Sequence, residues 1–149
     1  MKPASIRRFD LLYLASIALS LVAYLLSFDT LVTNTEARTA ATGVHLGAGT
    51  VIATMVISLG LSLLFWFLAS PRRMAVGKWL IVLFFLLGLT GVPGLLAGGW
   101  TVLKTLSALN LLLEAGAIYY LFQPDAKAWF AERDAIPVSR EGDTDLPAD

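Results

Sequence analysis

The sequence predicts an all-α membrane protein: a polytopic four-helix bundle with both termini in the cytoplasm and a short C-terminal interfacial helix. Three observations predict this fold class. Hydrophobic residues make up 57% of the chain and charged residues only 15%, a composition too apolar for an ordinary soluble domain. The apolar residues gather in long stretches with few charges. Lysine and arginine gather in segments that would lie on one side of a membrane.

The apolar stretches define the predicted helices. Each is about 20 residues long, which at about 1.5 Å per residue spans a hydrocarbon core of about 30 Å. They cover residues 9–28, 46–68, 79–98 and 100–122. We therefore expect a transmembrane bundle over residues 1–123, an interfacial amphipathic segment over 124–133 and a disordered acidic tail over 134–149.

The positive charges predict the orientation. Nine of the eleven basic residues lie before the first stretch, between the second and third, or after the fourth, and only Arg38 and Lys104 lie on the other side. Cytoplasmic loops of membrane proteins carry the excess of lysine and arginine. This bias predicts a multi-pass protein of the cell inner membrane, with the lipid bilayer as its surroundings.

The connections between helices differ in character. Residues 29–45 are predicted to form a polar outer loop, which could hold a short helix capped by Asn34 or Thr35. Pro71 ends the second helix. In the glycine-rich connection 91–99, Pro93 either kinks the third helix or ends it near Val92, in which case that helix begins near Met74. A plain turn is favoured over a re-entrant loop, because irregular backbone at membrane depth needs protein or water around it.

The C-terminal segment changes character at Pro124. Pro124 and Asp125 suit the first turn of a helix. Backbone N–H groups there have no partner within the helix, so a proline costs no hydrogen bond. The N-terminus is also the positive end of the helix dipole, which favours a carboxylate. Trp129 and Phe130 are predicted to anchor this helix at headgroup level. A docking segment for a cytoplasmic partner is the alternative.

Small residues recur at four-residue spacing on the first two helices and predict packing seams, because small side chains let helix backbones approach in lipid. The first stripe is Ser16, Ser20, Ala23 and Ser27, and the second is Thr50, Thr54, Ser58 and Ser62, with Gly47 and Gly60 nearby. A transport path along these stripes is the less favoured interpretation. Bulky residues are expected to face lipid, namely Leu64, Phe65, Trp66, Phe84 and Phe85.

Glu114 is the acidic residue placed deep in a predicted span, roughly 12 Å from the cytoplasmic edge at the helical rise. A carboxylate in hydrocarbon is costly, so it should face the bundle and be paired, protonated or hydrated. Asn110 and Ser107 share its face. Residues expected at the same membrane depth on the other helices are Ser16, Ser58, Ser62 and Gly88. The candidate intramembrane polar site is thus Glu114, Asn110, Ser107, Ser16, Ser58 and Ser62. A structural lock is the favoured role, and proton or ligand coupling and a subunit interface remain open.

Several kinds of chemistry have no residues to support them in this sequence. There is no cysteine, and His45 is the one histidine, without ligands at metal-binding spacing. No serine–histidine–acid set or phosphate-binding glycine loop is present. The formal net charge of zero gives no basic field for nucleic acid. We expect no enzyme activity, no cofactor and no metal.

Two short motifs carry a resemblance. The start, Arg8-Phe9-Asp10-Leu11-Leu12-Tyr13-Leu14, and the end, Pro124-Asp125-Ala126-Lys127-Ala128-Trp129-Phe130, resemble those of uncharacterised small four-helix inner-membrane proteins of proteobacteria. That resemblance implies a bacterial inner membrane and four helices, and it implies no activity.

Two functional hypotheses follow. The first is a non-enzymatic bundle that acts as an accessory or oligomeric membrane component, either as a homo-oligomer or beside a membrane partner subunit. The alternative is a small transporter or permeability factor that uses Glu114. A dry bundle with a hydrogen-bonded Glu114 would favour the first hypothesis, and a cavity reaching Glu114 would favour the second.

Overall fold

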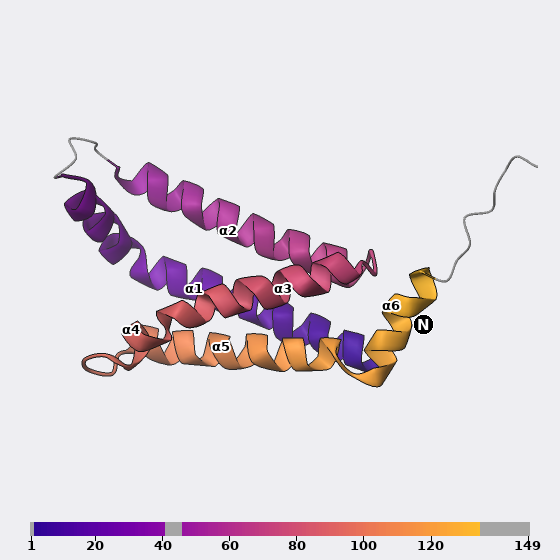
Figure 1. The fold of residues 1–149 in the computed structure, drawn as a ribbon. Helices are drawn as coiled ribbons and strands as arrows, with labels where there is room; N and C mark the ends of the chain where they lie inside the picture. The colour runs from indigo at the N-terminus through magenta and orange to yellow at the C-terminus, as the bar shows by residue number, and fades with distance from the viewer. Residues whose placement is uncertain (1, 41–45, 135–149) are drawn as a thin grey trace, which may run out of the picture.

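The computed structural model describes residues 2–40 and 46–134 (Figure 1). Within these ranges the regular structure is helical, and four helices are long and apolar enough to cross a membrane: Ala4–Ala40, Ala48–Ala69, Ala75–Leu96 and Val102–Leu121. The predicted all-α membrane bundle of four spans is confirmed. The chain is a multi-pass membrane protein built as a helical bundle.

Helix α1 (Ala4–Ala40) is much longer than predicted. The outer loop expected from residue 29 is wrong as far as Ala40, and so are the caps expected at Asn34 and Thr35, because the helix runs through them without a break. Residues 4–40 contain no glycine or proline, and threonine hydroxyls in the polar part donate to carbonyls four residues earlier, as Thr35 does to Leu31 at 2.7 Å.

Helices α2 (Ala48–Ala69) and α3 (Ala75–Gly88) form a tight hairpin. Pro71 lies in the turn, as expected, and Arg73 takes the left-handed conformation at φ 52°. Next to the turn, a Cβ placed on Gly77 would lie 2.6 Å from the backbone nitrogen of Ala69. Glycine therefore allows the two helices to touch backbone to backbone.

The third span begins at Ala75, directly after its N-cap residue Met74, and continues beyond Gly88. A short 3-10 turn η1 (Leu89–Gly91) leads into α4 (Val92–Leu96), which has Pro93 in its first turn. The early start of this helix is confirmed, while Pro93 opens a short helix instead of ending one. The non-helical connection is confined to residues 97–101, where Gly98 has φ 70°.

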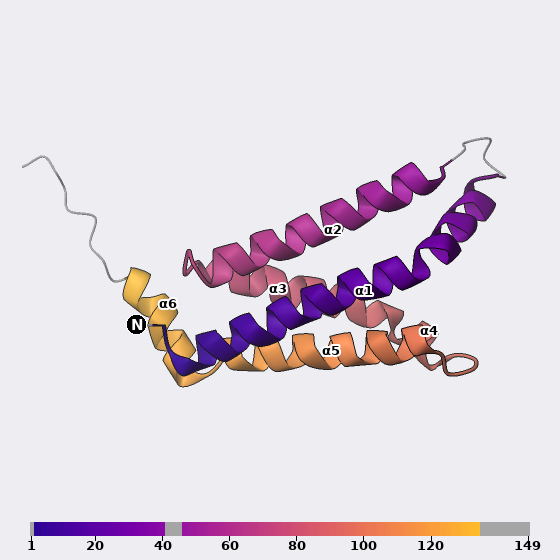
Figure 2. The ribbon, with the colours of Figure 1, turned by 180° about the vertical axis from the view of Figure 1, so that it is seen from behind.

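Helix α5 (Val102–Leu121) is capped by Thr101, whose hydroxyl accepts the backbone N–H of Lys104 at 3.3 Å. It runs antiparallel to α1 and makes the most extensive helix–helix contact of the described bundle with it. Helix α6 (Pro124–Asp134) then turns sharply and crosses the end of the bundle beside the start of α1 (Figures 1 and 2). The predicted C-terminal helix is confirmed.

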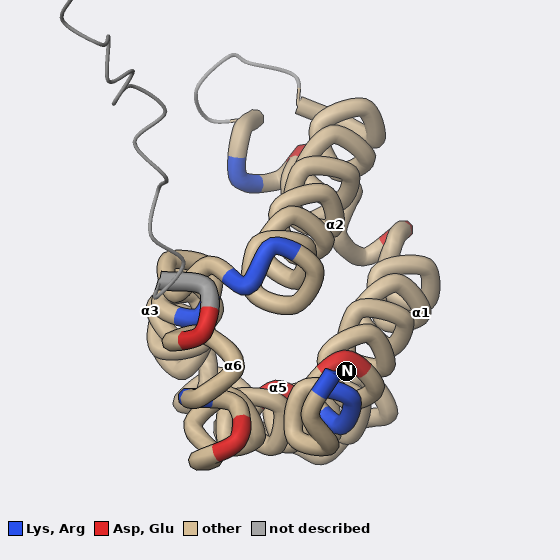
Figure 3. Tube along the Cα trace, turned by 90° about the vertical axis from the view of Figure 1, so that its right-hand side faces the viewer, with Lys and Arg blue, Asp and Glu red and all other residues tan. Residues whose placement is uncertain are grey.

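We call the end of the bundle where residue 2, the α2–α3 turn and α6 meet the basic end. Figure 3 views it along the bundle, with lysines and arginines around the helix ends. The buried hydrophobic core lies here and comprises Ile6, Phe9, Tyr13, Phe65, Ala69, Ile81, Ala117, Leu121, Ala126, Trp129 and Phe130. Toward the opposite end α1 diverges from α5 and α2 diverges from α3, while α4 stays beside α5 (Figures 1 and 2), and Val51 is the buried hydrophobic residue described there.

Candidate functional site

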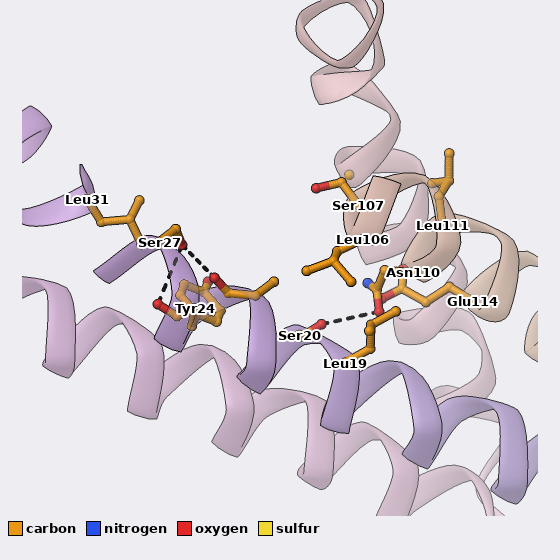
Figure 4. Close-up of a pocket in the computed structure, with 12 residues that line it drawn as sticks. Leu19, Ser20, Tyr24, Ser27, Leu31, Leu106, Ser107, Asn110, Leu111 and Glu114 are labelled. Atoms are coloured by element: carbon orange, nitrogen blue, oxygen red, sulfur yellow. Dashed lines mark hydrogen bonds between the residues drawn. The ribbon is translucent and has the colours of Figure 1, made fainter. Parts of the chain in front are cut away.

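Glu114 and Asn110 form a hydrogen-bonded pair one turn apart on α5. The Asn110 amide donates from Nδ2 to Glu114 Oε1 at 3.0 Å, and its Oδ1 accepts the hydroxyl of Ser20 on α1 at 3.3 Å. Figure 4 shows this chain of contacts crossing from α1 to α5. The amide thus uses its donor toward the carboxyl group and its acceptor toward the neighbouring helix.

Two cavities meet at this pair. The first, which we call the α1–α5 cavity, has a volume of about 320 Å³, and the second, the α2–α3 cavity, of about 340 Å³. Gly88, Asn110 and Glu114 line both. The Glu114 carboxyl group therefore has open space on two sides, although it lies in the middle of a membrane-spanning helix.

The α1–α5 cavity exists because small side chains face each other in the diverging part of the bundle. Ser20, Ala23 and Ser27 line it from α1, Ser107 from α5 and Gly88 from α3. The stripe predicted on the first helix does face α5, but beyond Ser20 it leaves space instead of bringing the backbones together. The Ser27 hydroxyl donates to the Ala23 carbonyl at 2.7 Å and adds no bond between helices.

The α2–α3 cavity reaches Glu114 from the other side. Ser58 and Ser62 line it from α2, and Tyr13 from α1. The Tyr13 side chain faces both Ser62 and the Glu114 carboxyl group. The sequence analysis predicted the two serines near Glu114 but not Tyr13. The phenol hydroxyl of Tyr13, a polar group in an apolar stretch, could have indicated it.

Ser16 was predicted at the depth of Glu114 and does not reach it. Its side chain is only 1% exposed, and its hydroxyl donates to the Tyr13 carbonyl of its own helix at 2.8 Å. Ser107 similarly donates to the Leu103 carbonyl at 2.9 Å, although it lines the α1–α5 cavity. Among the described residues the hydrogen bond to Glu114 comes from Asn110 instead of from a serine hydroxyl.

The predicted seam on α2 holds over half its length. Ser58 and Ser62 are half-buried, while Thr54 is exposed and a Cβ on Gly60 would meet nothing within 4 Å. Nearer its start, α2 contacts α1 again: Thr50 is half-buried, and a Cβ on Gly47 would lie 3.1 Å from Glu36 Oε1.

The bulky residues also divide into two groups. Leu64 and Phe84 are exposed as expected for a lipid-facing surface, whereas Phe65 is buried and its ring packs against that of Phe84 at a tilt of 55°, with centroids 4.8 Å apart. Trp66 is half-buried and its indole N–H donates to Asp10 Oδ1 at 2.9 Å. The lipid-facing assignment is therefore wrong for Phe65 and Trp66, which pack inside the bundle.

A polar cluster at the basic end was not foreseen. Lys2 Nζ lies 3.0 Å from Asp10 Oδ2 and 3.0 Å from the Ser70 hydroxyl, and Trp66 holds the other oxygen of Asp10. These contacts join the start of α1 to the end of α2. The apolar pattern of residues 9–28 concealed Asp10, which sits one residue inside that stretch.

The described residues contain no group of three or more histidine, aspartate or glutamate side chains able to hold a metal ion. His45 lies outside the described residues, as do the tail residues from 135 onward. A scan against protein-family models and searches of curated proteins and of solved structures found no match.

Proposed function

We propose that this protein is a small transporter or permeability factor of the inner membrane, and that Glu114 is the group that exchanges a proton or binds the solute. One observation carries the proposal: the Glu114 carboxyl group is exposed to cavities on two sides of α5. A carboxyl group that only held helices together would be enclosed by its partners.

The cavities also have the chemistry of a small-solute site. Ligand pockets are largely apolar with a few convergent polar groups, and volumes start at about 300 Å³. Here leucines surround the hydroxyls of Ser20 and Ser107 and the Asn110–Glu114 pair. Such a site suits a proton or a small amphipathic solute with a hydrogen-bonding or cationic group, and ionisable residues inside membranes often mark such pathways.

The test is flux in liposomes. Glu114→Gln keeps an oxygen that can accept the Asn110 amide, so the fold and its thermal stability in detergent should be preserved. Purified protein would be reconstituted with a trapped pH-sensitive dye, and proton flux measured under a pH gradient. We expect flux in the wild type and its loss, by about tenfold or more, in Glu114→Gln.

Asp29→Asn is the matched control, because Asp29 is an exposed carboxylate on α1 that lines neither cavity. It should leave flux unchanged. Equal proton flux in the wild type and in Glu114→Gln would contradict the proposal. So would a wild type that carries neither protons nor any of a set of small amines tested as solutes.

A second candidate is a non-enzymatic accessory or oligomeric component, and a specific observation favours it. Gly60 lies on the exposed surface of α2, where a Cβ would meet nothing within 4 Å, so no described helix covers this position. A second copy or a membrane partner subunit would fit such a surface, because small residues permit close helix approach. Size-exclusion chromatography with light scattering in mild detergent decides this: Gly60→Leu should dissociate an oligomer and leave a monomer unchanged.

A further inference from the structure

A third cavity lies at the basic end, where α1 begins and α5 ends. Its volume is about 280 Å³, and it shares no lining residue with the two cavities at Glu114. Its polar lining combines two charged residues with hydroxyl and amide side chains: Ser5, Arg8, Tyr119, Tyr120, Gln123 and Asp125. The transport proposal makes no use of these residues.

The two charges face one cavity without neutralising each other. The ion pairs within the described residues are Lys2–Asp10 and Arg73–Glu132, so Arg8 and Asp125 are not paired together. The Arg8 guanidinium lies 5.6 Å from the centre of the Tyr120 ring, a contact that leaves its N–H donors free. The cavity therefore offers one cation and one anion side by side.

Asp125 is held in place and kept charged. Its Oδ2 accepts the backbone N–H of Ser5 at 3.2 Å, and its Oδ1 accepts that of Ala126 at 3.0 Å. Desolvation opposes the charged form, but hydrogen bonds from Ser5 and Ala126 outweigh it and lower the pKa of the Asp125 carboxyl group. Each oxygen keeps a lone pair for a further donor.

We place the cavity at the depth of lipid headgroups, from its position at the ends of two spans. It sits between the first turn of α1 and the last turn of α5, where two apolar spans reach the membrane surface. Tyr119, on its rim, is 63% exposed, and tyrosine is typical of the membrane–water interface. Leu11, one turn from Arg8, is exposed and provides an apolar surface for an acyl chain.

We propose that this cavity binds the headgroup of a zwitterionic phospholipid with a primary ammonium, its phosphate on Arg8 and its ammonium on Asp125. Phosphatidylethanolamine has this chemistry. A purely anionic headgroup would meet the Asp125 carboxylate, and a choline headgroup has no N–H to donate to it.

The test is lipid binding to the purified full chain by native mass spectrometry. Phosphatidylethanolamine, phosphatidylcholine and phosphatidylglycerol with identical acyl chains would be titrated separately. We expect phosphatidylethanolamine to bind about tenfold more tightly than phosphatidylcholine, the difference that one charge-assisted hydrogen bond supplies. Arg8→Gln should weaken phosphatidylethanolamine binding, and Asp125→Asn should remove its preference over phosphatidylcholine.

Two further variants distinguish binding at this site from non-specific electrostatic attraction and from a loss of folding. Arg7→Gln is the matched control, because Arg7 is an exposed arginine on the same helix that does not line the headgroup cavity. Asp125→Glu keeps the charge and should restore the lipid preference. Circular dichroism spectra would establish that each variant is folded.

Three results would overturn the proposal. Equal affinity for phosphatidylethanolamine and phosphatidylcholine would exclude the Asp125–ammonium contact. A loss in Arg7→Gln as large as in Arg8→Gln would indicate diffuse attraction instead of a site. Water-soluble glycerophosphoethanolamine binding as tightly as the lipid would identify a free metabolite as the ligand.

Discussion

Gly77 lets α3 lie directly against the backbone of α2. A methyl group there would overlap the Ala69 nitrogen at 2.6 Å and the Leu68 carbonyl carbon at 2.8 Å, and backbone atoms cannot rotate away as a side chain can. We predict that Gly77→Ala destabilises the bundle by about 1–3 kcal/mol, the usual cost of overpacking. The measurement is thermal unfolding in detergent followed by circular dichroism.

Gly60→Ala is the control for that prediction, because a Cβ at Gly60 meets nothing within 4 Å and alanine is the better helix former. It should be neutral or stabilising by up to about 1 kcal/mol. Equal destabilisation by both substitutions would show that α2 and α3 do not approach as closely as described.

Asp125 makes the contact between α1 and α6 sensitive to acid. Its pKa is lowered in the folded protein below its ordinary 3.8, so its contribution to stability is complete above that value. The contribution is lost as pH falls through the lower folded pKa, because the protonated acid accepts the Ser5 and Ala126 amides poorly. We therefore predict a small drop in melting temperature of the wild type below pH 4, relative to Asp125→Asn, whose side chain does not titrate.

At the scale of elements, α6 is held to the bundle by an aromatic side chain and a cation. Trp129 is 8% exposed, and the Arg73 guanidinium lies 3.4 Å from the centre of its ring. The headgroup anchor expected for Trp129 and Phe130 is wrong, since both side chains pack into the protein core. Arg73 also bonds to Glu132 at 3.4 Å, so the α2–α3 turn and α6 contact each other twice.

We predict that Trp129→Ala destabilises the bundle by about 3–5 kcal/mol, as truncation of a large buried aromatic does. Trp129→Phe should cost much less, because the indole N–H has no hydrogen-bond partner among the described residues and a phenyl ring still faces Arg73. Thermal unfolding of the two variants in detergent gives the comparison. If α6 only rested on the lipid surface, neither variant would change the melting temperature of the bundle.

The sequence predicts where the membrane spans lie more readily than it predicts the polar ends of the helices or which side chains face protein instead of lipid. Counting apolar residues located all four spans, because a hydrocarbon core sets their length. It did not predict that α1 continues to Ala40, since polar helical residues outside the membrane carry no apolar signal. It also misplaced Phe65 and Trp129, because a protein interior and a lipid tail are both apolar and favour the same side chains.

Some features of the candidate site could likewise be predicted from the sequence, and others could not. Four-residue spacing placed Asn110 on the same face of α5 as Glu114, and the two side chains are hydrogen bonded. Depth alone also suggested Ser16, but a hydroxyl can return to its own helix, and the direction of a side chain depends on packing against helices distant in sequence. The cavities could not be foreseen, because they arise where helices diverge.

At the scale of the whole molecule, the orientation in the membrane can be tested directly. The basic end gathers the N-terminal segment, the α2–α3 turn and α6 on one side (Figure 1). We propose that this side is cytoplasmic, following the distribution of lysine and arginine. Reporter fusions after Arg73 and after Asp134 should read as cytoplasmic, and a fusion at Gly99 as external. A cytoplasmic signal from Gly99 would require a different number of spans or the reverse orientation.

The concentration of buried side chains at one end has a mechanical consequence. Helices α1 and α5 pack together at the basic end and diverge toward the opposite end, so a small rotation of α1 near Ile6 becomes a larger displacement where α1 ends. We expect the lipids around this end of the bundle to influence how far α1 lies from α5. Lateral pressure among these lipids, which changes with acyl-chain length and saturation, would widen or narrow the space beside Glu114 without any contact being made to it.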